Sequence, residues 1–214
     1  MSTIRVTAIR RSHRAEFIEL FKQMHETRKQ QFVDRLSWPL GVRFGYELDR
    51  YDSRLGGAWY ILCTFQGADK IAGSMRLLST SGFHLFEMFP ALRDVSAIDS
   101  NAFTWEASRM CISVSLSDRR VGLGSIAGVS AGLLLGMNEF GLQRDAHRFV
   151  GVYYEPMLRI YRRIGWEPRE LGRVTGNNGE DLISGEWSVS CTNRDTIRRR
   201  MSDFDFEIDL PFPG

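Results

Sequence analysis

Short apolar runs, some alternating with polar residues, predict most of the strands in this chain. Runs of β-branched and aromatic residues bounded by polar or glycine-containing segments are typical of strands. The predicted strands cover residues 4–8, 58–65, 71–79, 103–114, 147–154, 168–175 and 186–191. Residues 81–101 show no clear period and predict an irregular connection. A chain with this many strands needs helices to cover its sheet, and the pattern supplies them.

Apolar residues at three- and four-residue spacing predict a helix from about Ser12 to Gln31. A second helix is predicted over residues 126–140, and a third begins near Pro156 and stops at Gly165. Proline suits a first helical turn, and glycine suits a helix end. The alternation of strands and helices favours an α/β fold.

The strand 103–114 carries two charges, Glu106 and Arg109, within an otherwise apolar run. A buried ion pair that fixes strand register would explain them, and so would a functional site. Strict alternation puts residues three apart on opposite faces of a strand. If both side chains serve one site, the pleat must be interrupted, and we expect a β-bulge or marked twist between Trp105 and Met110.

Further charged residues lie upstream of this strand. Three carboxylates, Glu47, Asp49 and Asp52, fall within six residues. A solvated acidic loop would explain them; calcium binding is a weaker alternative, because the glycine and terminal glutamate of an EF-hand are missing. Arg76 lies in the strand 71–79, where a strand arginine either extends to solvent or adds an inward charge.

A glycine loop separates the strand 103–114 from the helix 126–140. Its pattern is Arg119-x-x-Gly122-x-Gly124. Glycines between a strand and a helix let backbone N–H groups approach an anion, and the helix dipole adds a favourable potential. This loop therefore predicts a phosphate-binding segment.

The order of elements resembles the GCN5-related acyltransferase fold, a three-layer α-β-α arrangement around a mixed, splayed central sheet. The glycine loop matches the pantetheine-pyrophosphate loop of that fold. Within this superfamily the chain resembles the LuxI-type acyl-homoserine-lactone synthases. The positions that carry the resemblance are Arg28, Phe32, Trp38, Glu47, Asp49, Asp52, Arg76, Glu106, Ser108 and Arg109.

The resemblance implies an enzyme that moves an acyl chain from a pantetheine thioester to the amine of S-adenosylmethionine. The lactone then closes and methylthioadenosine leaves. Glu106, with Ser108 and Arg109, is the implied catalytic group, acting as a base directly or through a water molecule. The implied S-adenosylmethionine site consists of Arg28, Phe32, Trp38, Glu47, Asp49, Asp52 and Arg76.

The acyl chain is expected to enter where the strands of Glu106 and of residues 147–154 splay apart. Arg119, Gly122 and Gly124 would hold the pantetheine, and Gly151 and Tyr153 would line the acyl pocket. Relatives that take 3-oxo chains resemble one another in having threonine on the second strand. Because this chain has Gly151 and tyrosines there, we expect an unsubstituted acyl group of short to medium length.

Composition narrows the setting of this activity. At 214 residues and 43% hydrophobic, the chain predicts a single domain over residues 1–214, with 203–214 as a C-terminal extension that packs loosely or at an interface. A net charge of +2 does not call for nucleic acid. Three widely spaced cysteines favour free thiols in a reducing compartment, and we expect no metal site. We expect no apolar run of transmembrane length, and therefore a cytoplasmic bacterial enzyme.

The partners that we expect are small molecules. S-adenosylmethionine and an acyl-CoA or acyl-carrier-protein thioester would be substrates, and no cofactor would be permanently bound. The carrier protein itself is the one macromolecular partner implied. An N-acetyltransferase that uses acetyl-CoA would explain the glycine loop but not the charged set, and an acyl-CoA-binding regulator would leave the acidic loop as mere surface.

Overall fold

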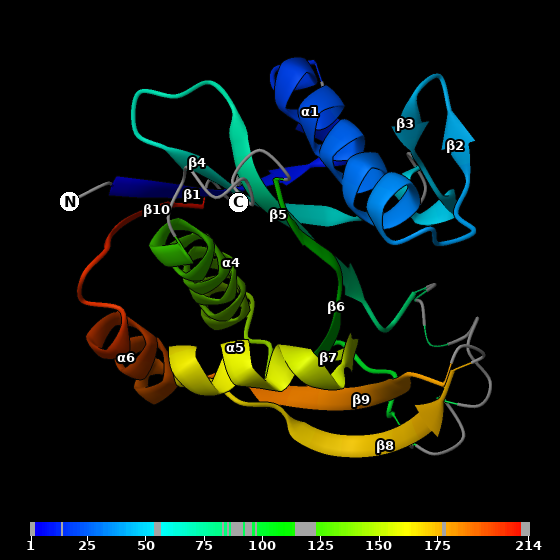
Figure 1. Ribbon diagram of the computed structural model, residues 1–214. Helices are drawn as coiled ribbons and strands as arrows, with labels where there is room; N and C mark the ends of the chain where they lie inside the picture. The colour runs from blue at the N-terminus through cyan, green and yellow to red at the C-terminus, as the bar shows by residue number, and fades with distance from the viewer. Residues whose placement is uncertain are drawn as a thin grey trace. The chain divides into compact units, whose positions relative to one another are not determined.

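The computed structural model describes residues 3–13, 15–53, 57–82, 84, 86, 92, 96, 98–113, 123–176 and 179–210. The chain divides into two compact units, whose elements are labelled in Figure 1. Unit 1 comprises Met1–Arg76, Arg109–Gly136 and Asp203–Gly214, and unit 2 comprises Leu77–Ser108 and Met137–Ser202. The expectation of a single domain therefore stays a prediction.

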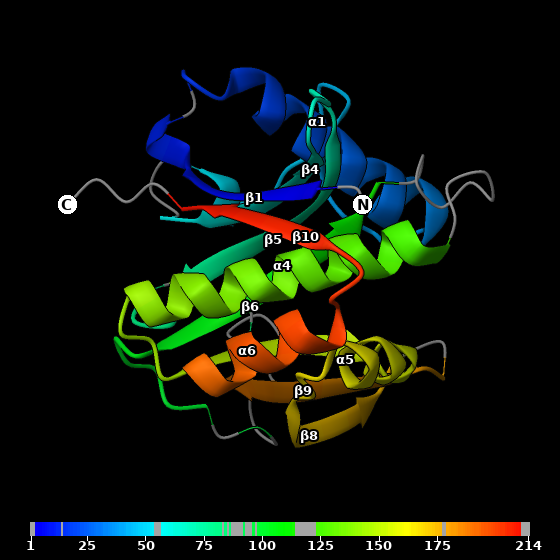
Figure 2. The same cartoon turned by 90° about the vertical axis from the view of Figure 1, so that its left-hand side faces the viewer.

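The strands of unit 1 follow the order β10-β1-β4-β5-β6. They are β1 (Thr3–Arg10), β4 (Trp59–Phe65), β10 (Asp205–Asp209) and parts of two strands shared with unit 2: β5 (Ile71–Ser79) up to Arg76 and β6 (Thr104–Ile112) from Arg109. β1 is antiparallel to β4 and parallel to β10, and Figure 2 shows β1 and β10 side by side. The expectation of a loosely packed C-terminal extension is wrong for 205–209, because these residues pair with Thr3–Thr7.

The first helix of unit 1 begins later than its sequence predicts. A 3-10 turn, η1 (Arg11–His13), is followed by α1 (Ile18–Arg28), which continues without a break as the π-helix η2 (Lys29–Arg35). A π-helical turn widens the helix and is often found at functional sites. A small hairpin, β2 (Val42–Arg43) and β3 (Tyr46–Glu47), and the 3-10 turn η3 (Arg50–Asp52) come next.

The long helix α4 (Leu123–Gln143) contains the predicted helix 126–140. In unit 1 its glycines let the helix axis approach the sheet closely. A Cβ atom at Gly136 would lie 2.6 Å from Val6 and 2.7 Å from Ile61, so only glycine fits at this distance. Val6 and Ile61 are fully buried in the core beneath the helix.

One segment of α4 also passes a test of length and composition for a membrane span. Ser125–Gln143 has 19 residues, but 78% of its most apolar window is buried inside the protein, as in the core helix of a folded domain. The expectation that no apolar run reaches transmembrane length is therefore wrong, because this segment of α4 reaches it.

Unit 2 contains the mixed part of the sheet, in the order β5-β6-β7-β9-β8. β7 (Arg148–Tyr154) runs parallel to β6 and antiparallel to β9 (Asp181–Ser188), which pairs in turn with β8 (Arg169–Thr175). Figure 1 shows the strands β8 and β9 side by side, next to the helix α5 (Leu158–Ile164). The 3-10 turn η5 (Glu155–Met157) precedes α5, which ends at Gly165 as predicted, with φ at +92°.

The predicted strand 186–191 is wrong in its bounds. The strand ends at Ser188, and Ser190 then caps a helix, α6 (Cys191–Arg200), by accepting a hydrogen bond from the N–H of Asn193. Ile197 is the buried residue of this helix, and arginines occupy its last turn. Because so few of its residues are apolar and buried, the sequence of this helix shows no helical periodicity.

The strand β6 is interrupted as predicted. The N–H of Thr80 donates to the carbonyl of Thr104, and the N–H of Ser113 donates to the carbonyl of Ala72. One more residue lies between the two β6 positions than between the two β5 positions, which is the definition of a β-bulge. Arg109 has φ at +54°, a left-handed value uncommon outside glycine. The bulge therefore lies within the strand that carries Glu106 and Arg109.

The predicted splay is also present. β6 and β7 pair at three positions, ending at Glu106 and Val150, although β7 continues to Tyr154. With its parallel and antiparallel strands, its covering helices and this splay, the chain has the predicted α/β fold with a mixed central sheet.

Candidate active site

Charged side chains in unit 1 form one connected group, which we call the ion-pair cluster. Its members are Arg28, Glu47, Asp49, Asp52, Arg76 and Arg109. All six were predicted site residues, and the structure brings them together from a helix end, a hairpin, a turn and two strands.

The acidic part of the cluster is ordered by its own backbone. Asp49 is the N-cap of η3, and its carboxylate accepts from the N–H of Tyr51 at 2.9 Å. The carboxylate of Asp52 accepts in return from the N–H of Asp49 at 3.0 Å. This reciprocal capping box orients both carboxylates through backbone hydrogen bonds.

Arg28 is the centre of the cluster and ends α1 at the start of the π-helix. Its Nε donates to Glu47 at 2.6 Å, and its two Nη atoms donate to the two oxygens of Asp52 at 2.9 and 3.0 Å. Tyr60 adds a hydroxyl hydrogen bond to Asp52 at 2.8 Å. The side chains of Arg28, Glu47 and Asp52 are at most 1% exposed, so the interpretation as a solvated acidic loop is wrong for these residues.

The two strand arginines complete the cluster. Arg76 donates to Asp49 at 2.7 Å and to Asp52 at 3.3 Å; because its side chain is fully buried, the alternative that it extends to solvent is wrong. Arg109 reaches Glu47 at 3.3 Å and Asp49 at 3.4 Å from the bulge of β6. The left-handed backbone of Arg109 thus accompanies a side chain aimed at the cluster.

Three arginines pair with three carboxylates in the cluster, and this pairing affects the pKa of Asp52 and of Arg109. Burial alone would raise the pKa of Asp52, but the charges of Arg28 and Arg76 and the hydrogen bond from Arg28 hold that pKa well below its usual value. Burial lowers the pKa of Arg109, and Arg76 and Arg28 also lower it, against the opposing effect of Glu47.

His25 lies beside the cluster and is neutral. Burial and the charge of Arg28 lower its pKa to about 4, and its Nδ1 lies 3.0 Å from the carbonyl oxygen of Glu47. A neutral ring with the proton on Nδ1 satisfies this contact. Its other nitrogen has no hydrogen-bond partner within the described part of the chain.

Exposure to solvent separates the cluster into a buried interior and an open edge. Asp49 is 20% exposed and Arg109 is 10% exposed, whereas the other members are sealed from solvent. Phe32 and Trp38 lie at this edge: their rings stack at 4.9 Å, and the guanidinium of Arg109 lies 5.7 Å from the ring of Phe32. This edge therefore presents one acidic side chain, one arginine and an aromatic pair.

Glu106 belongs to unit 2, where it is fully buried. Its backbone is in register with Val150 of β7. Its carboxylate lies 3.8 Å from the Nδ1 of His84, and the Nε2 of that ring lies 3.2 Å from the hydroxyl of Ser100. Ser108 follows on the same strand and is partly buried.

Gly151 and Tyr153 are packed closely against their neighbours. A Cβ atom at Gly151 would lie 2.7 Å from the carbonyl oxygen of Ala107, so the glycine allows the backbones of β6 and β7 to approach. Tyr153 packs edge-on against Tyr161 and Trp187. The expectation that these two residues shape the acyl pocket stays a prediction.

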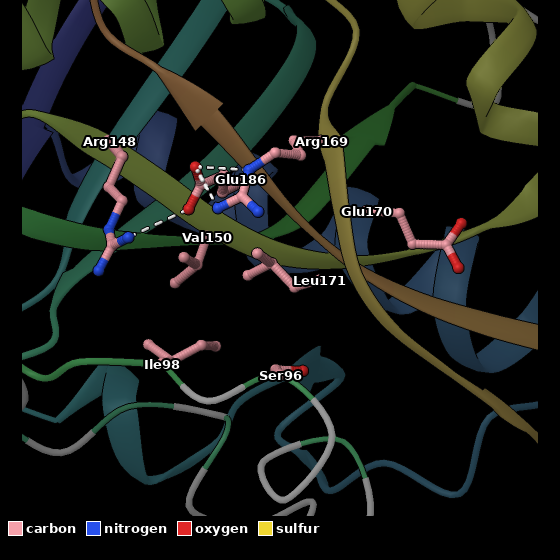
Figure 3. Close-up of a pocket in the computed structure, with 8 residues that line it drawn as sticks. All are labelled: Ser96, Ile98, Arg148, Val150, Arg169, Glu170, Leu171 and Glu186. Carbon is pink, nitrogen blue, oxygen red and sulfur yellow. Dashed lines mark hydrogen bonds and ion pairs between the residues drawn. The ribbon is translucent and has the colours of Figure 1, made fainter.

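A cavity of about 280 Å³ lies beside Val150, on the other face of β7 (Figure 3). Val150, Leu171 and Ile98 face it, while Arg148 and Arg169 both reach Glu186 at its rim, at 3.1 and 2.8 Å. Its full lining is Ser96, Ile98, Arg148, Val150, Arg169, Glu170, Leu171 and Glu186. The cavity therefore combines three apolar side chains with a charged rim.

The predicted pantetheine loop falls mostly outside the described residues. Arg119 and Gly122 lie there, and Gly124 lies in the first turn of α4. Among the residues that the structure does describe, no group of three His, Cys, Asp and Glu side chains is placed to hold a metal ion.

Sequence reasoning missed several residues around the site. Tyr60 and His25 complete the hydrogen bonding of the cluster, and His84 lies beside Glu106. Tyr60 lies in a predicted strand whose apolar pattern hides it, and His84 lies in the irregular connection. A histidine in that connection was the only available signal.

Comparison with known proteins gives the same picture. A family model described as autoinducer synthase matches residues 12–197. An acyl-homoserine-lactone synthase of Rhizobium etli is 33% identical over 195 residues, which cover 91% of this chain and 88% of that protein. The structure of BjaI, a CoA-dependent acyl-homoserine lactone synthase with SAM and isopentyl-CoA, superposes with a TM-score of 0.82 at 21% identity, covering 99% of this chain and 95% of that one.

A more distant structural match links the fold to the wider acyltransferases. A putative N-acetyltransferase from Lactobacillus plantarum superposes with a TM-score of 0.56 at 13% identity, covering 87% of this chain and 99% of that one. The match of the family model to most of the chain, together with the Rhizobium etli relative, decides the assignment. This chain belongs to the autoinducer synthase family.

Proposed function

We propose that the chain transfers an acyl group from a thioester to the amine of S-adenosylmethionine and then closes the lactone, with the open edge of the ion-pair cluster as the S-adenosylmethionine site. The products are an N-acyl-homoserine lactone and methylthioadenosine. The observation that carries this proposal is the partial exposure of Asp49 and Arg109, which pair with the buried, charge-balanced interior of the cluster.

The chemistry of S-adenosylmethionine suits this edge. The substrate brings a sulfonium, an ammonium and a carboxylate, so its site needs an anion, a cation and aromatic surface. Asp49 would contact the positive groups, Arg109 the carboxylate, and the Phe32–Trp38 pair would exclude water. A pair of unit charges about 4 Å apart is worth roughly 4 kcal/mol at an effective dielectric of 20.

The sealed members of the cluster would act by positioning. Arg28, Glu47, Asp52 and Arg76 are at most 1% exposed, so they hold Asp49 and Arg109 in place rather than contact the ligand. We therefore expect different outcomes for the two groups. Substitutions at the edge should weaken S-adenosylmethionine binding, and substitutions in the buried interior should lower the stability of the fold.

Acylation needs a base, which we assign to Glu106. An α-amino group with a pKa of about 8 is mostly protonated at neutral pH and cannot attack a thioester until it loses a proton. Ser108, on the same strand, is proposed as a further polar contact to the reacting groups. Lactone closure needs only positioning, because the methionyl carboxylate attacks its own γ-carbon and methylthioadenosine leaves.

The substitution Glu106→Gln tests the base. It should lower turnover roughly 10²- to 10⁴-fold and leave the dissociation constant for S-adenosylmethionine within about twofold. Product is measured by mass spectrometry of the lactone, and binding by calorimetry. Glu207→Gln, at a half-exposed carboxylate paired with Arg5, is the matched control and should change neither. Near-full turnover of Glu106→Gln at saturating substrate would place the base elsewhere.

We propose that the acyl chain occupies the cavity beside Val150. Val150 is in register with Glu106, and it faces the cavity together with Leu171 and Ile98. The hydroxyls of Ser96 and Ser184 lie 2.6 Å apart and also reach the backbone carbonyls of Leu92 and Gly172, so their protons are engaged within the protein and we expect them to offer no donor to a 3-oxo group. An unsubstituted chain of short to medium length fits this arrangement.

The product profile tests the cavity. Enlarging the cavity with Leu171→Ala should shift the lactones towards longer chains, because overpacking by extra methylenes costs about 1 to 3 kcal/mol. Wild-type products dominated by chains of twelve or more carbons, or by 3-oxo species, would contradict this proposal.

We propose an acyl-CoA as the donor, since the glycine loop of the sequence suits a CoA pyrophosphate. One observation favours an acyl carrier protein instead: the neighbouring helices α5 and α6 expose arginines. These are Arg159, Arg163, Arg198 and Arg199, which form no ion pair with any described residue. Carrier proteins are acidic, and a basic surface would attract them.

The ratio of kcat/KM for one acyl group on the two carriers separates the donors. A carrier-protein preference above about tenfold, or roughly 1.4 kcal/mol, would reject the CoA proposal. The double substitution Arg163→Glu and Arg198→Glu should then lower kcat/KM with the carrier protein and leave it unchanged with CoA.

The setting that we propose for this reaction is the bacterial cytoplasm. All three cysteines are free thiols, with Cys63 and Cys111 buried and Cys191 exposed, as a reducing compartment favours. Recovery of the tagged protein in the periplasmic fraction would contradict this placement.

A further inference from the structure

The proposed reaction must release one proton in every turnover. The substrate ammonium loses two protons as it becomes an amide nitrogen, and the departing thiolate takes up one of them. Lactone closure uses a carboxylate and moves no proton. The second proton has to leave through Glu106, if that residue is the base, and Glu106 is fully buried.

A path to the surface begins at the carboxylate of Glu106. Its Oε2 lies 3.8 Å from the Nδ1 of His84, which is longer than a hydrogen bond but within the range of a small side-chain rotation. The Nε2 of His84 lies 3.2 Å from the hydroxyl of Ser100, and Ser100 is exposed. The imidazole, 5% exposed, therefore has one nitrogen towards the base and the other towards the surface.

We infer that His84 carries the released proton from Glu106 to Ser100 and solvent. The inference rests on the proposed function, because it takes Glu106 as the base. Nδ1 of the neutral ring accepts the proton from the carboxyl group, which returns Glu106 to the carboxylate. The imidazolium gives up its Nε2 proton to Ser100, whose hydroxyl proton passes to water, and the neutral ring returns to its starting tautomer by exchange with solvent.

Imidazole is suited to this step. A free imidazole titrates at about 6.5, between a free carboxyl group at about 4.3 and an α-amino group at about 8. A group of intermediate basicity accepts and releases a proton near neutral pH without a large barrier in either direction. Its two nitrogens also let the proton enter on one side and leave on the other.

The test compares His84→Gln with Glu106→Gln in the full-length protein. His84→Gln keeps hydrogen-bonding groups but cannot exchange protons, so kcat should fall by about 10- to 100-fold while the KM values stay within about twofold. Added imidazole should restore a large part of the lost kcat in His84→Ala, an effect that a purely structural role would not show. Ser100→Ala should cost less, about two- to fivefold, because water reaches this position.

His147→Gln is the matched control. His147 is an exposed histidine of unit 2 that stacks on Phe103 at 4.6 Å. Its kcat should equal that of the wild type. If His84→Gln does not fold, as judged by its thermal unfolding, the smaller His84→Asn replaces it in the same assays.

The two failures are distinguishable. Full turnover of Glu106→Gln would overturn the proposed base itself. A large loss in Glu106→Gln, combined with wild-type kcat in His84→Gln, would overturn the proton path and leave the proposed function intact. A loss in both without rescue by imidazole would show that His84 has only a structural role, and would also overturn this inference.

Discussion

Replacing Asp52 by asparagine should destabilise the protein more than any surface substitution. The carboxylate of Asp52 accepts two hydrogen bonds from Arg28 and others from Tyr60, Arg76 and the N–H of Asp49. Its side chain is 1% exposed. Asparagine keeps the shape but removes the charge, and its amide nitrogen cannot accept from a guanidinium.

The magnitude follows from the burial of the partners. Arg28 and Arg76 stay sealed from water and lose their shared counter-charge, and breaking a buried ion pair on one side costs about 3 to 5 kcal/mol. The free energy of unfolding of a typical domain is about 5 to 15 kcal/mol, so this loss is a large fraction of it.

Urea unfolding followed by tryptophan fluorescence measures this loss. With a slope of about 2 kcal/mol per molar urea, the unfolding midpoint of Asp52→Asn should fall by roughly 1.5 to 2.5 M. Asp34→Asn is the matched control: Asp34 is 48% exposed and pairs with Lys29, so its midpoint should move by less than about 0.3 M. A shift for Asp52→Asn as small as the control's would refute the claim that the cluster is a sealed electrostatic unit.

Other measurements follow from the same structure. Because the folded-state pKa of Asp52 lies below its unfolded value, its contribution to stability is present above about pH 4 and is lost as the pH falls further; the urea midpoint should therefore drop below about pH 4, and less steeply in Asp52→Asn. Asp49→Asn, at the open edge, should raise the dissociation constant for S-adenosylmethionine about tenfold in calorimetry and cost less stability than Asp52→Asn, a ranking that the reverse order would contradict. A thiol reagent should modify exposed Cys191 first, and the other two cysteines only on unfolding, because burial raises the pKa of both their thiols; mass spectrometry of the labelled protein checks the order.

The strand that carries Glu106 and Arg109 shows how far sequence reasoning reaches. Two charges three residues apart in an apolar strand predicted an interruption of the pleat, and β6 has a bulge with Arg109 in a left-handed conformation. Periodicity succeeds here because strand geometry is local and allows few exceptions. It failed for α6, whose narrow buried stripe and arginine-rich last turn give no helical signal.

The members of the ion-pair cluster were predictable from the sequence, but its division into a buried interior and an open edge was not. Spacing and family resemblance pointed to Asp49 and Asp52 equally, and only the packing of Tyr60 and Arg28 around Asp52 seals one of them. His84 shows the opposite limit: its role depends on a neighbour far along the chain, and an irregular connection has no period that could reveal it.

The pairing of β1 with β10 has a consequence for the order of folding. Thr3 and Asp205 are hydrogen-bonded neighbours although 202 residues separate them in the chain. A ribosome making this protein therefore releases β1 long before its parallel partner exists, and contacts so distant in sequence form slowly. Until β10 is synthesised, one edge of β1 has unpaired backbone groups that another chain can occupy. The unit that holds the ion-pair cluster is thus completed late in synthesis, and its nascent form depends most on protection from aggregation.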